Sequence, residues 1–558
     1  MKRQDFLVFS LLGAMCLTGT LFTSCSSSGE GKDITLQVKT LAGTVEGTEK
    51  DGVKFFLGVP FAEAPVGELR WKAPQPLQPW KGVKETKAFG NDPMQPSIFG
   101  DMAFRGPAKS EDCLYLNIWT PAKKDNEGLP VLIYFNGGGL MAGSGSEPRY
   151  DGEAIAREGV IGVTANYREG IFGFIAHPDL TEESPYKGSG NYGFLDQVAA
   201  IKWVKDNIKA FGGDPGRITI VGESAGSFSV SLLMASPLSK GDIAGAMLSS
   251  GAEVMPYAAV PLAEAEAQGK ALLESKALGS IADARKVGAD QLQAMLPPRG
   301  MANVVLDGYF MKESADEVFS KGEQAQVPLL AGWNSQEGNP LQSLRGVAPT
   351  VANYKKAMKG TFGEMTDEIF QAYGILKDED VLSQKGVDLA SDLFTGFPTW
   401  KTCDYHVLYS DCPVYRYKYM HPRPQVSAKM GDMVGALAGG VRKMTEEERR
   451  AEAARPKVVP GAVHSADIEY AMGNLATNEY YEWNEDDYAI SELFLSYYAN
   501  FCKSGNPNGE NLPKWDPITK ENRDSAPVLH IDTQTLQVQD PARENAYRTL
   551  EKFYLSRK

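Results

Sequence analysis

The feature that most constrains this chain is a serine between two glycines, in the pentapeptide Gly222-Glu-Ser-Ala-Gly226. Residues 218–221 form a short apolar run typical of a buried strand, and residues 228–235 begin a helical pattern. A turn this tight leaves no room for side chains at the two glycines. The pattern predicts that the Ser224 hydroxyl stands exposed at a strand end, near a helix N-terminus that favours negative charge. The alternative, a chance Gly-Ser-Gly turn, is disfavoured by the strand and helix beside it.

A serine hydroxyl is a weak nucleophile and needs a general base, for which histidine is the usual choice. Four of the five histidines follow Ser224, namely His406, His421, His464 and His530. His406 falls in an expected helix and His530 in a strand-like run, so both favour structural roles. His464 lies in a loop that leads into a helix, where an imidazole can be presented, and is the predicted base. His421, which follows an expected strand, remains an alternative.

The acid that orients such a base is expected on a loop after a strand, between the serine and the histidine. Residues 327–333 are the expected strand, and Glu337 lies in the loop that follows. A carboxylate there can hold the tautomer of the imidazole and stabilise its positive form. The alternative is that Glu337 is one more solvated carboxylate.

Three consecutive glycines follow another expected strand, residues 131–135, in the run Asn136-Gly-Gly-Gly-Leu140. Glycines allow the backbone to approach a ligand closely, so their N–H groups can stabilise a developing oxyanion. A flexible loop is the alternative, but the position after a strand suits an oxyanion hole.

Short β-rich runs alternate with longer helical stretches from residue 38 onward, which predicts an α/β fold. We expect a central, mostly parallel, twisted sheet covered by helices on both faces. Further strands are expected at residues 160–165, 246–249, 414–419 and 527–531, and a helix at 192–211. Residues 38–557 are interpreted as a single domain.

The N-terminus has the parts of an export signal. Lys2 and Arg3 precede an apolar stretch that ends in small residues before Cys25. This resembles the lipobox of a bacterial lipoprotein, with residues 1–24 as the signal peptide, Cys25 as the lipidated residue and 25–37 as a tether. We therefore expect an exported protein, lipid-anchored in the bacterial cell envelope at the outer membrane or cell surface. The alternative is plain secretion with an incidental cysteine.

Composition excludes several other partners. The formal net charge of −14 argues against a nucleic-acid partner. No internal apolar run is long enough to span a bilayer, so membrane contact is expected only through the lipid anchor. The cysteines beyond the leader match no metal-site spacing, and no metal is expected. Cys403 and Cys412 are close enough in sequence to form a disulfide, and unpaired thiols are an equal alternative.

Residues 422–460 are interpreted as an insertion of two helices. Apolar residues from Met430 to Val441 recur at helical spacing, and Thr445 begins a capping-box pattern ahead of a charged helix. Because this segment leads directly to His464, we expect it to pack over the entrance to the site and shape its alcohol side. A peripheral surface excursion is the alternative.

Several segments together resemble the type-B carboxylesterase family, the cholinesterase-like branch of the α/β-hydrolases. They are residues 56–62, 111–117, 166–168, 172–174, 207–215, the serine pentapeptide, Glu337-Gly338 and Ala462-Val463-His464. The resemblance covers nearly the whole mature chain and implies the α/β-hydrolase fold.

The resemblance implies a role for each matching residue. Ser224 would be the nucleophile, Glu337 the acid and His464 the base, with oxyanion N–H groups from Gly138, Gly139 and Ala225. Glu223 would be a buried carboxylate that supports the site. Two internal ion pairs are also implied, Arg70 with Glu111 and Arg168 with Asp196.

The chain departs from the family pattern at three places. Asn136 replaces the usual histidine before the glycines, and Leu140 replaces the usual aromatic residue after them, which affects the expected shape of the acyl pocket. Cys113 occupies a position of the family's first disulfide, but residues 91–95 contain no partner cysteine.

The implied reaction is hydrolysis of small-molecule carboxylic esters by acyl transfer to Ser224 and then to water, without a cofactor. An amidase or lactonase with the same triad is one alternative. A non-catalytic binding protein of the same fold is another, but all three triad positions hold competent residues.

Overall fold

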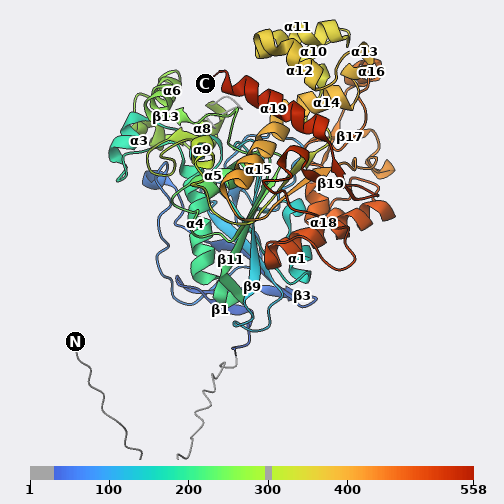
Figure 1. Ribbon diagram of the computed structural model, residues 1–558. Coiled ribbons are helices and arrows are strands. Elements are labelled where there is room, and N and C mark those ends of the chain that lie inside the picture. The colour runs from blue at the N-terminus through green and yellow to red at the C-terminus, as the bar shows by residue number, and fades with distance from the viewer. Residues whose placement is uncertain (1–30, 296–303, 558) are drawn as a thin grey trace, which may run out of the picture.

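The computed structural model describes residues 31–295 and 304–557, in which one large sheet organises the chain (Figure 1). The expected signal peptide and Cys25 lie outside the described residues. The sheet has 11 strands, and its spatial order is β20 (Leu536–Gln539), β19 (Pro527–Ile531), β16 (Val414–Tyr419), β15 (Leu329–Asn334), β12 (Gly245–Ser249), β11 (Gly213–Glu223), β9 (Leu129–Phe135), β10 (Ile161–Ala165), β8 (Tyr115–Thr120), β4 (Val53–Pro60) and β3 (Thr48–Lys50).

Parallel pairing dominates the middle of this sheet. Each neighbouring pair from β19 to β10 is parallel, whereas β8, β4 and β3 at one end and β20 at the other pair antiparallel. The predicted strands at 414–419 and 527–531 have the observed bounds, and β11 begins five residues before the expected start at Ile218. The α/β prediction of a mostly parallel sheet is therefore confirmed.

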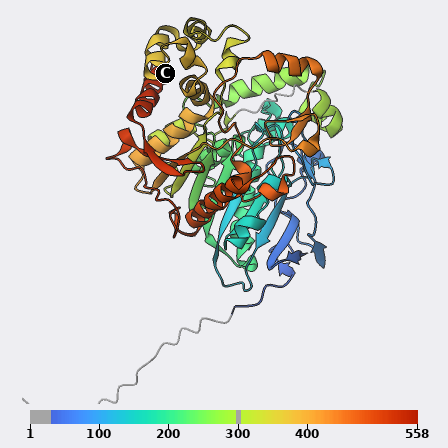
Figure 2. The same cartoon turned by 90° about the vertical axis from the view of Figure 1, so that its right-hand side faces the viewer.

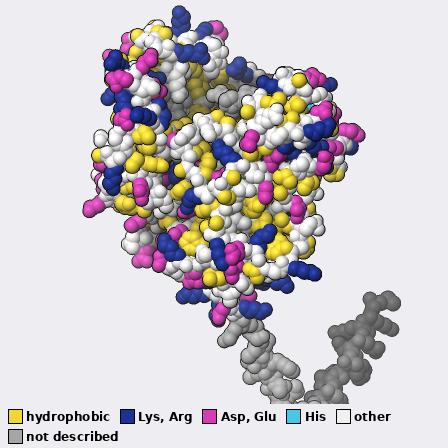
Figure 3. All heavy atoms as spheres, turned by 180° about the vertical axis from the view of Figure 1, so that it is seen from behind, with side chains coloured by type: hydrophobic (Ala, Val, Ile, Leu, Met, Phe, Trp, Pro, Cys, Tyr) yellow, Lys and Arg dark blue, Asp and Glu magenta, His cyan; other side chains and the backbone are white. Residues whose placement is uncertain are grey.

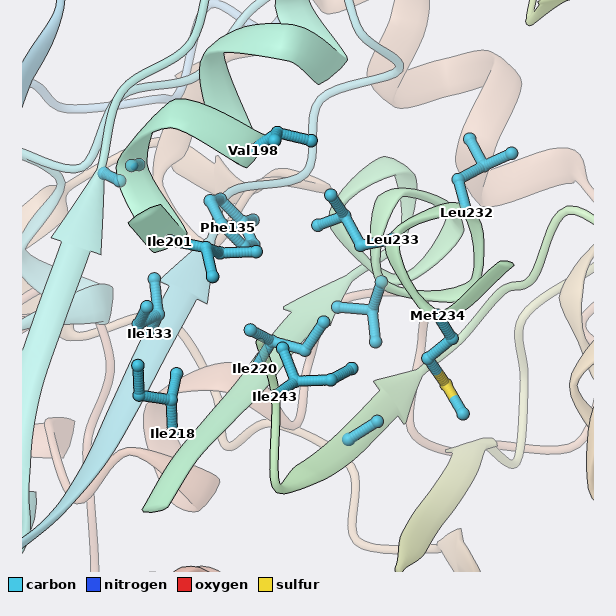
Figure 4. Packing of buried hydrophobic residues seen from close by; sticks show 14 of the residues in the cluster. Ile133, Phe135, Val198, Ile201, Ile218, Ile220, Leu232, Leu233, Met234 and Ile243 are labelled. Atoms are coloured by element: carbon cyan, nitrogen blue, oxygen red, sulfur yellow. The ribbon is translucent and has the colours of Figure 1, made fainter. Parts of the chain in front are cut away.

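Alternate residues of the central strands face opposite sides of the sheet, as the two-residue period of a strand requires. On one face, Ile133 and Phe135 of β9 belong to the same apolar cluster as Val198 and Leu233 (Figure 4). The helices that contribute to this face are α4 (Tyr192–Asn207), α5 (Ala225–Ala235), α9 (Ala315–Ser320) and α15 (Phe397–Tyr409).

The opposite face is covered by different helices. Leu132 and Tyr134 of β9 belong to a second apolar cluster, with Phe494 and Ile155. These last two residues come from α18 (Glu485–Ser504) and α1 (Glu153–Arg157). Burial on both faces explains why the central strands read as continuous apolar runs.

A group of helices covers one end of the molecule, away from the N-terminal strands (Figures 1 and 2). It comprises α10 (Pro340–Leu344), α11 (Val351–Phe362), α12 (Thr366–Ala372), α13 (Asp378–Val381), α14 (Gln384–Ser391) and α19 (Pro541–Leu555). Their apolar side chains pack around Trp333 and Trp400, which ties them to β15 and α15. A π-helical turn, Asp392–Gly396, joins α14 to α15.

The remaining elements lie in the loops around these layers. They are β1 (Gln37–Lys39), β2 (Thr44–Glu46), β5 (Val83–Glu85), β6 (Asp92–Pro93), β7 (Lys109–Ser110), α2 (Gly170–Gly173), α3 (Pro178–Glu183), β13 (Val260–Pro261), α6 (Leu262–Glu274), α7 (Ile281–Lys286), α8 (Ala289–Met295), β14 (Val305–Leu306) and α17 (Ile468–Ala471). On the face in Figure 3, acidic and basic side chains are interspersed over the surface.

The prediction of two helices in residues 422–460 is wrong for the first helix. A single 3-10 turn, Ala428–Met430, leads into an antiparallel hairpin of β17 (Met433–Gly435) and β18 (Val441–Lys443). The glycines at 431, 435, 439 and 440 explain the difference, because each costs a helix about 1 kcal/mol relative to alanine. The second helix is confirmed as α16 (Glu446–Ala454), with a capping box at Thr445.

Both expected ion pairs are present and buried. The guanidinium of Arg70 donates to both Glu111 oxygens at 2.6 Å. The guanidinium of Arg168 donates to the two oxygens of Asp196 at 2.7 and 2.8 Å. Breaking such a pair leaves an uncompensated buried charge, which is strongly destabilising. Each pair therefore favours the conformation that keeps its two residues together.

The cysteines of the described residues are all free thiols: Cys113, Cys403, Cys412 and Cys502. The disulfide between Cys403 and Cys412, left open above, does not form. Within the same part of the chain, none of the helices has both the length and the apolar character needed to cross a bilayer.

Candidate active site

Ser224 occupies the sharp turn between β11 and α5. Its backbone has φ 55° and ψ −124°, a left-handed conformation that side chains rarely adopt. A Cβ added at Gly222 would lie 2.3 Å from the carbonyl carbon of Gly226, and one added at Gly226 would lie 2.1 Å from the carbonyl oxygen of Phe135. The two glycines are therefore required by contact distance, as the sequence predicted.

The three predicted triad residues meet in one hydrogen-bonded chain. Nε2 of His464 lies 2.8 Å from Oγ of Ser224, and Nδ1 lies 2.5 Å from Oε2 of Glu337. All three come from loops at the ends of different elements, so their contact depends on the assembled sheet. This geometry suits a base that accepts the serine proton at one nitrogen and donates to a carboxylate from the other.

Glu337 is held by two further donors. Its Oε1 accepts a hydrogen bond from the Ser250 hydroxyl at 2.5 Å and from the Asn334 backbone N–H at 2.6 Å. The Asn334 side chain also donates to the carbonyl of Val463, next to the imidazole. Ser250, directly after β12, was not singled out in the sequence, although it follows a predicted strand whose end borders the site.

The other histidines of the C-terminal half lie elsewhere. His406 contacts the Val327 carbonyl at 2.8 Å, and burial lowers its pKa to about 4. His421, the alternative base, contacts the carboxylates of Asp487 and Asp532 at 3.1 Å each. His530 lies in β19, and burial lowers its pKa to about 4. The structure brings only His464 to the serine among the described histidines.

Glu223 is a buried carboxylate beside the imidazole, as expected. Its Oε1 lies 3.4 Å from Nε2 of His464 and has no hydrogen-bond partner among the described residues. Burial raises the pKa of Glu223 to about 8, against the opposing effect of the imidazolium. For His464, burial lowers the pKa, but the nearby carboxylates of Glu223 and Glu337 outweigh burial and raise it to about 9.

The glycine run after β9 lies beside Ser224, since a Cβ added at Gly137 would lie 3.1 Å from Cβ of Ser224. Gly138 and Gly139 have φ of 110° and 67°, and a Cβ at Gly138 would lie 1.8 Å from the Ala142 carbonyl oxygen. Neither N–H donates to another group in residues 31–295 or 304–557. Ala225 is the first residue of α5, where a backbone N–H has no partner within the helix. Gly138, Gly139 and Ala225 all line the cavity described next.

The serine opens into a cavity of about 440 Å³. Most of its lining is apolar, and the aromatic and methionine side chains are Phe99, Met102, Tyr150, Phe194, Phe228, Tyr257 and Phe394. The ring of Phe394, on the π-helical turn, lies 5.0 Å from the imidazole of His464. These residues come from six separated segments, so no local sequence signal could have grouped them.

The segment before His464 also reaches the cavity. Leu437 and Ala438, in the loop of the β17–β18 hairpin, form part of the lining. The carbonyl of Leu437 accepts a hydrogen bond from the Ser465 hydroxyl at 2.7 Å, which ties the loop to the residue after the imidazole. Which side of an ester this loop meets stays a prediction.

The two departures from the family pattern have defined positions. Leu140 lines the cavity, where an aromatic side chain was the expectation. Asn136 is buried and donates from Nδ2 to the Glu169 carboxylate at 3.1 Å. Elsewhere in the described residues, no cluster of three or more His, Cys, Asp or Glu side chains has the arrangement of a metal site.

Comparison with known proteins places this site in a family. The model of the Carboxylesterase family matches residues 33–550. Fumonisin B1 esterase of Sphingopyxis macrogoltabida is 38% identical over 461 residues, covering 75% of this chain and 80% of that protein. Liver carboxylesterase 1 of Oryctolagus cuniculus is 33% identical over 510 residues, covering 83% of each.

Solved structures agree with the fold. A structure of PNB esterase superposes with a TM-score of 0.74 at 27% identity, over 91% of this chain and 98% of that one. The Geobacillus stearothermophilus carboxylesterase EST55 gives 0.73 at 29% identity, over 92% and 100%. With its mixed sheet between two helical layers, the chain has the α/β-hydrolase fold, belongs to the carboxylesterase family and is a carboxylic ester hydrolase.

Proposed function

We propose that this enzyme hydrolyses carboxylic esters through a covalent acyl-enzyme on Ser224. In the first step Nε2 of His464 takes the hydroxyl proton while Oγ attacks the ester carbonyl carbon. The carbonyl oxygen becomes an oxyanion, which accepts hydrogen bonds from the N–H groups of Gly138, Gly139 and Ala225. The imidazolium then gives its proton to the departing alcohol oxygen.

The second step repeats this chemistry with water. The imidazole takes a proton from water, the hydroxide attacks the acyl carbon, and the acid leaves as the proton returns to Ser224. Glu337 stabilises the imidazolium in both steps and keeps Nε2 free to accept. Every proton is returned, so the cycle needs no cofactor.

The observation that carries this proposal is the hydrogen-bonded chain from Ser224 through His464 to Glu337, at 2.8 and 2.5 Å, at the edge of a largely apolar cavity. A binding protein has no need of that alignment. An amidase or a lactonase needs the same hydrogen-bonded triad, so a comparison of substrates must distinguish these activities from ester hydrolysis.

A panel of 4-nitrophenyl esters of increasing acyl length, with the matching 4-nitroanilides, tests the activity. We expect release of 4-nitrophenol well above release of 4-nitroaniline for each acyl group, because nitrophenolate is a good leaving group, whereas the amine must be protonated as it departs. Absorbance at saturating substrate gives both rates. Anilide turnover equal to or faster than ester turnover would favour the amidase alternative.

The rate should depend on pH through His464. Only the neutral imidazole can act as the base, and the pKa of His464 is raised, so kcat/KM should increase with pH through mildly acid and neutral values toward about 9. Because the Glu223 carboxylate contributes to raising that pKa, Glu223→Gln should move the rising limb to lower pH. Steady-state kinetics of both forms at constant ionic strength give the two profiles. A flat profile, or a shift of the variant to higher pH, would contradict this assignment.

We also propose that the enzyme is exported and lipidated at Cys25, on the basis of the leader sequence alone. The full-length protein expressed in a bacterial host should incorporate labelled palmitate and partition into the detergent phase of Triton X-114. Cys25→Ala should abolish both properties while leaving the specific activity of the folded domain unchanged. Export of unlabelled wild-type protein into the aqueous phase would support plain secretion instead.

A further inference from the structure

Glu253 is an ionisable group on the cavity wall that the mechanism does not use. It lies beyond the end of β12, its side chain is half-buried, and it forms part of the lining. Among the described residues its carboxylate has no hydrogen-bond or ion-pair partner. Its backbone, by contrast, is anchored, because the Glu253 N–H donates a hydrogen bond to the Ser231 hydroxyl of α5 at 2.8 Å. The carboxylate itself has no charge-compensating contact among the described residues.

The other ionisable groups of the lining differ in this respect. Arg149 donates to Glu147 at 2.7 Å, and His464 contacts Glu337 at 2.5 Å. Glu223 lies 3.4 Å from the same imidazole. Burial raises the pKa of Glu253 to about 7, and no cation among the described residues opposes that rise.

Aromatic side chains line the same cavity as this carboxylate. The rings of Phe228 and Tyr257 meet edge to face at 5.0 Å, and both line the cavity. The pKa of Tyr257 is raised to about 12 by burial and, to a smaller extent, by the charge of Glu253, which places the phenol near the carboxylate. The Tyr257 hydroxyl donates to the Phe394 carbonyl at 2.8 Å, so its ring is fixed too.

A carboxylate that is partly removed from water and gains no partner is destabilised, and a ligand that supplies a partner offsets that cost. A cation recovers the most, because a charged partner is stronger than a neutral donor and aromatic faces attract cations as well. We infer that Glu253, with Phe228 and Tyr257, forms a subsite for a positively charged nitrogen carried by the ester substrate. The inference rests on the proposed ester hydrolysis at Ser224.

Two pairs of isosteric esters test it, one with the charge on each side of the ester bond. On the acyl side, the 4-nitrophenyl ester of 4-(trimethylammonio)butanoic acid is compared with that of 5,5-dimethylhexanoic acid. On the alcohol side, 2-(trimethylammonio)ethyl acetate is compared with 3,3-dimethylbutyl acetate. Each pair differs by a permanent charge on a group of the same shape, so kcat/KM ratios report recognition of charge.

Wild-type enzyme should prefer the charged member of at least one pair by about tenfold, the effect of one modest ion pair. Glu253→Gln should bring that ratio close to one while leaving kcat/KM for the neutral ester within about threefold. Glu510→Gln, which removes the same charge from an exposed loop, should keep the wild-type ratio. The side that shows the preference gives the orientation of the substrate.

Equal ratios in wild type and Glu253→Gln, or a preference for the neutral ester in both pairs, would overturn the inference. Neutral esters that are hydrolysed normally in those cases leave the proposed function intact. Failure of the proposed function has a different signature, since wild type would then hydrolyse none of the four esters, or Ser224→Ala would hydrolyse them as fast as wild type.

Discussion

Replacement of Ser224 by Ala is expected to lower kcat for ester hydrolysis by about 10⁵- to 10⁶-fold. Among the described residues, the Ser224 hydroxyl is the group that is hydrogen-bonded to Nε2 of His464, at 2.8 Å, so its loss leaves no nucleophile there to form the acyl-enzyme. Substrate binding should change little, because the cavity and the oxyanion N–H groups remain. Spectrophotometric assay of a 4-nitrophenyl ester, with the uncatalysed rate subtracted, measures the loss.

Ser227→Ala is the matched control for this variant. Ser227 lies three residues further along in α5, and its hydroxyl donates to the Gly251 carbonyl at 2.5 Å, not to the imidazole. The control removes the same atom from the same helix and should retain activity within about tenfold, with a stability loss of about 1 kcal/mol. Retention of substantial activity by Ser224→Ala would show that the nucleophile lies elsewhere.

Glu337→Gln is expected to lower kcat by about 10⁴-fold with little change in fold. The reason is the arrangement of donors around the carboxylate. Ser250 and the Asn334 N–H both donate to Oε1, so the amide oxygen of the glutamine should occupy that position and its NH₂ should face Nδ1 of His464. An imidazole that accepts at Nδ1 carries its proton on Nε2 and cannot take one from Ser224.

The Glu337→Gln variant should therefore lose activity without losing thermal stability. The melting temperature should stay within a few degrees of wild type while kcat collapses, and Glu510→Gln should be unchanged in both. A loss of less than about tenfold in kcat would mean that Glu337 does not set the tautomer of His464. The neighbouring carboxylate of Asp467, which accepts from Ser249 and Asn334, would then be the next residue to replace.

Local signals in the sequence were reliable guides to structure. Gly222 and Gly226 identified the turn because a Cβ added at either position would lie 2.1–2.3 Å from a backbone atom, which leaves no room for a side chain. The capping box at Thr445 identified the start of α16 for a similar reason, since its partners lie within three residues. The capping box and the constraint at Gly222 are decided by neighbours in sequence, whereas Gly226 is limited by the Phe135 carbonyl on β9.

Long-range features were harder to predict. His464 lies 240 residues from Ser224 and 127 from Glu337, so their meeting could be expected only from the order of the segments and from family resemblance. The hairpin at Met433–Gly435 and Val441–Lys443 was mistaken for a helix because its apolar spacing fits both structures, and the glycines between them were undervalued. Glu253 gave no local signal, since the residues that share its cavity lie far apart in the sequence.

The central claim is that an acyl group becomes bonded to Oγ of Ser224, and mass spectrometry can observe that bond. Rapid acid quenching during turnover of a slowly deacylating 4-nitrophenyl ester should yield protein heavier by one acyl group, with the added mass on the peptide that contains Ser224. The same peptide of Ser224→Ala should carry no added mass. Continued wild-type turnover with no adduct, or with the acyl group on another residue, would contradict the account.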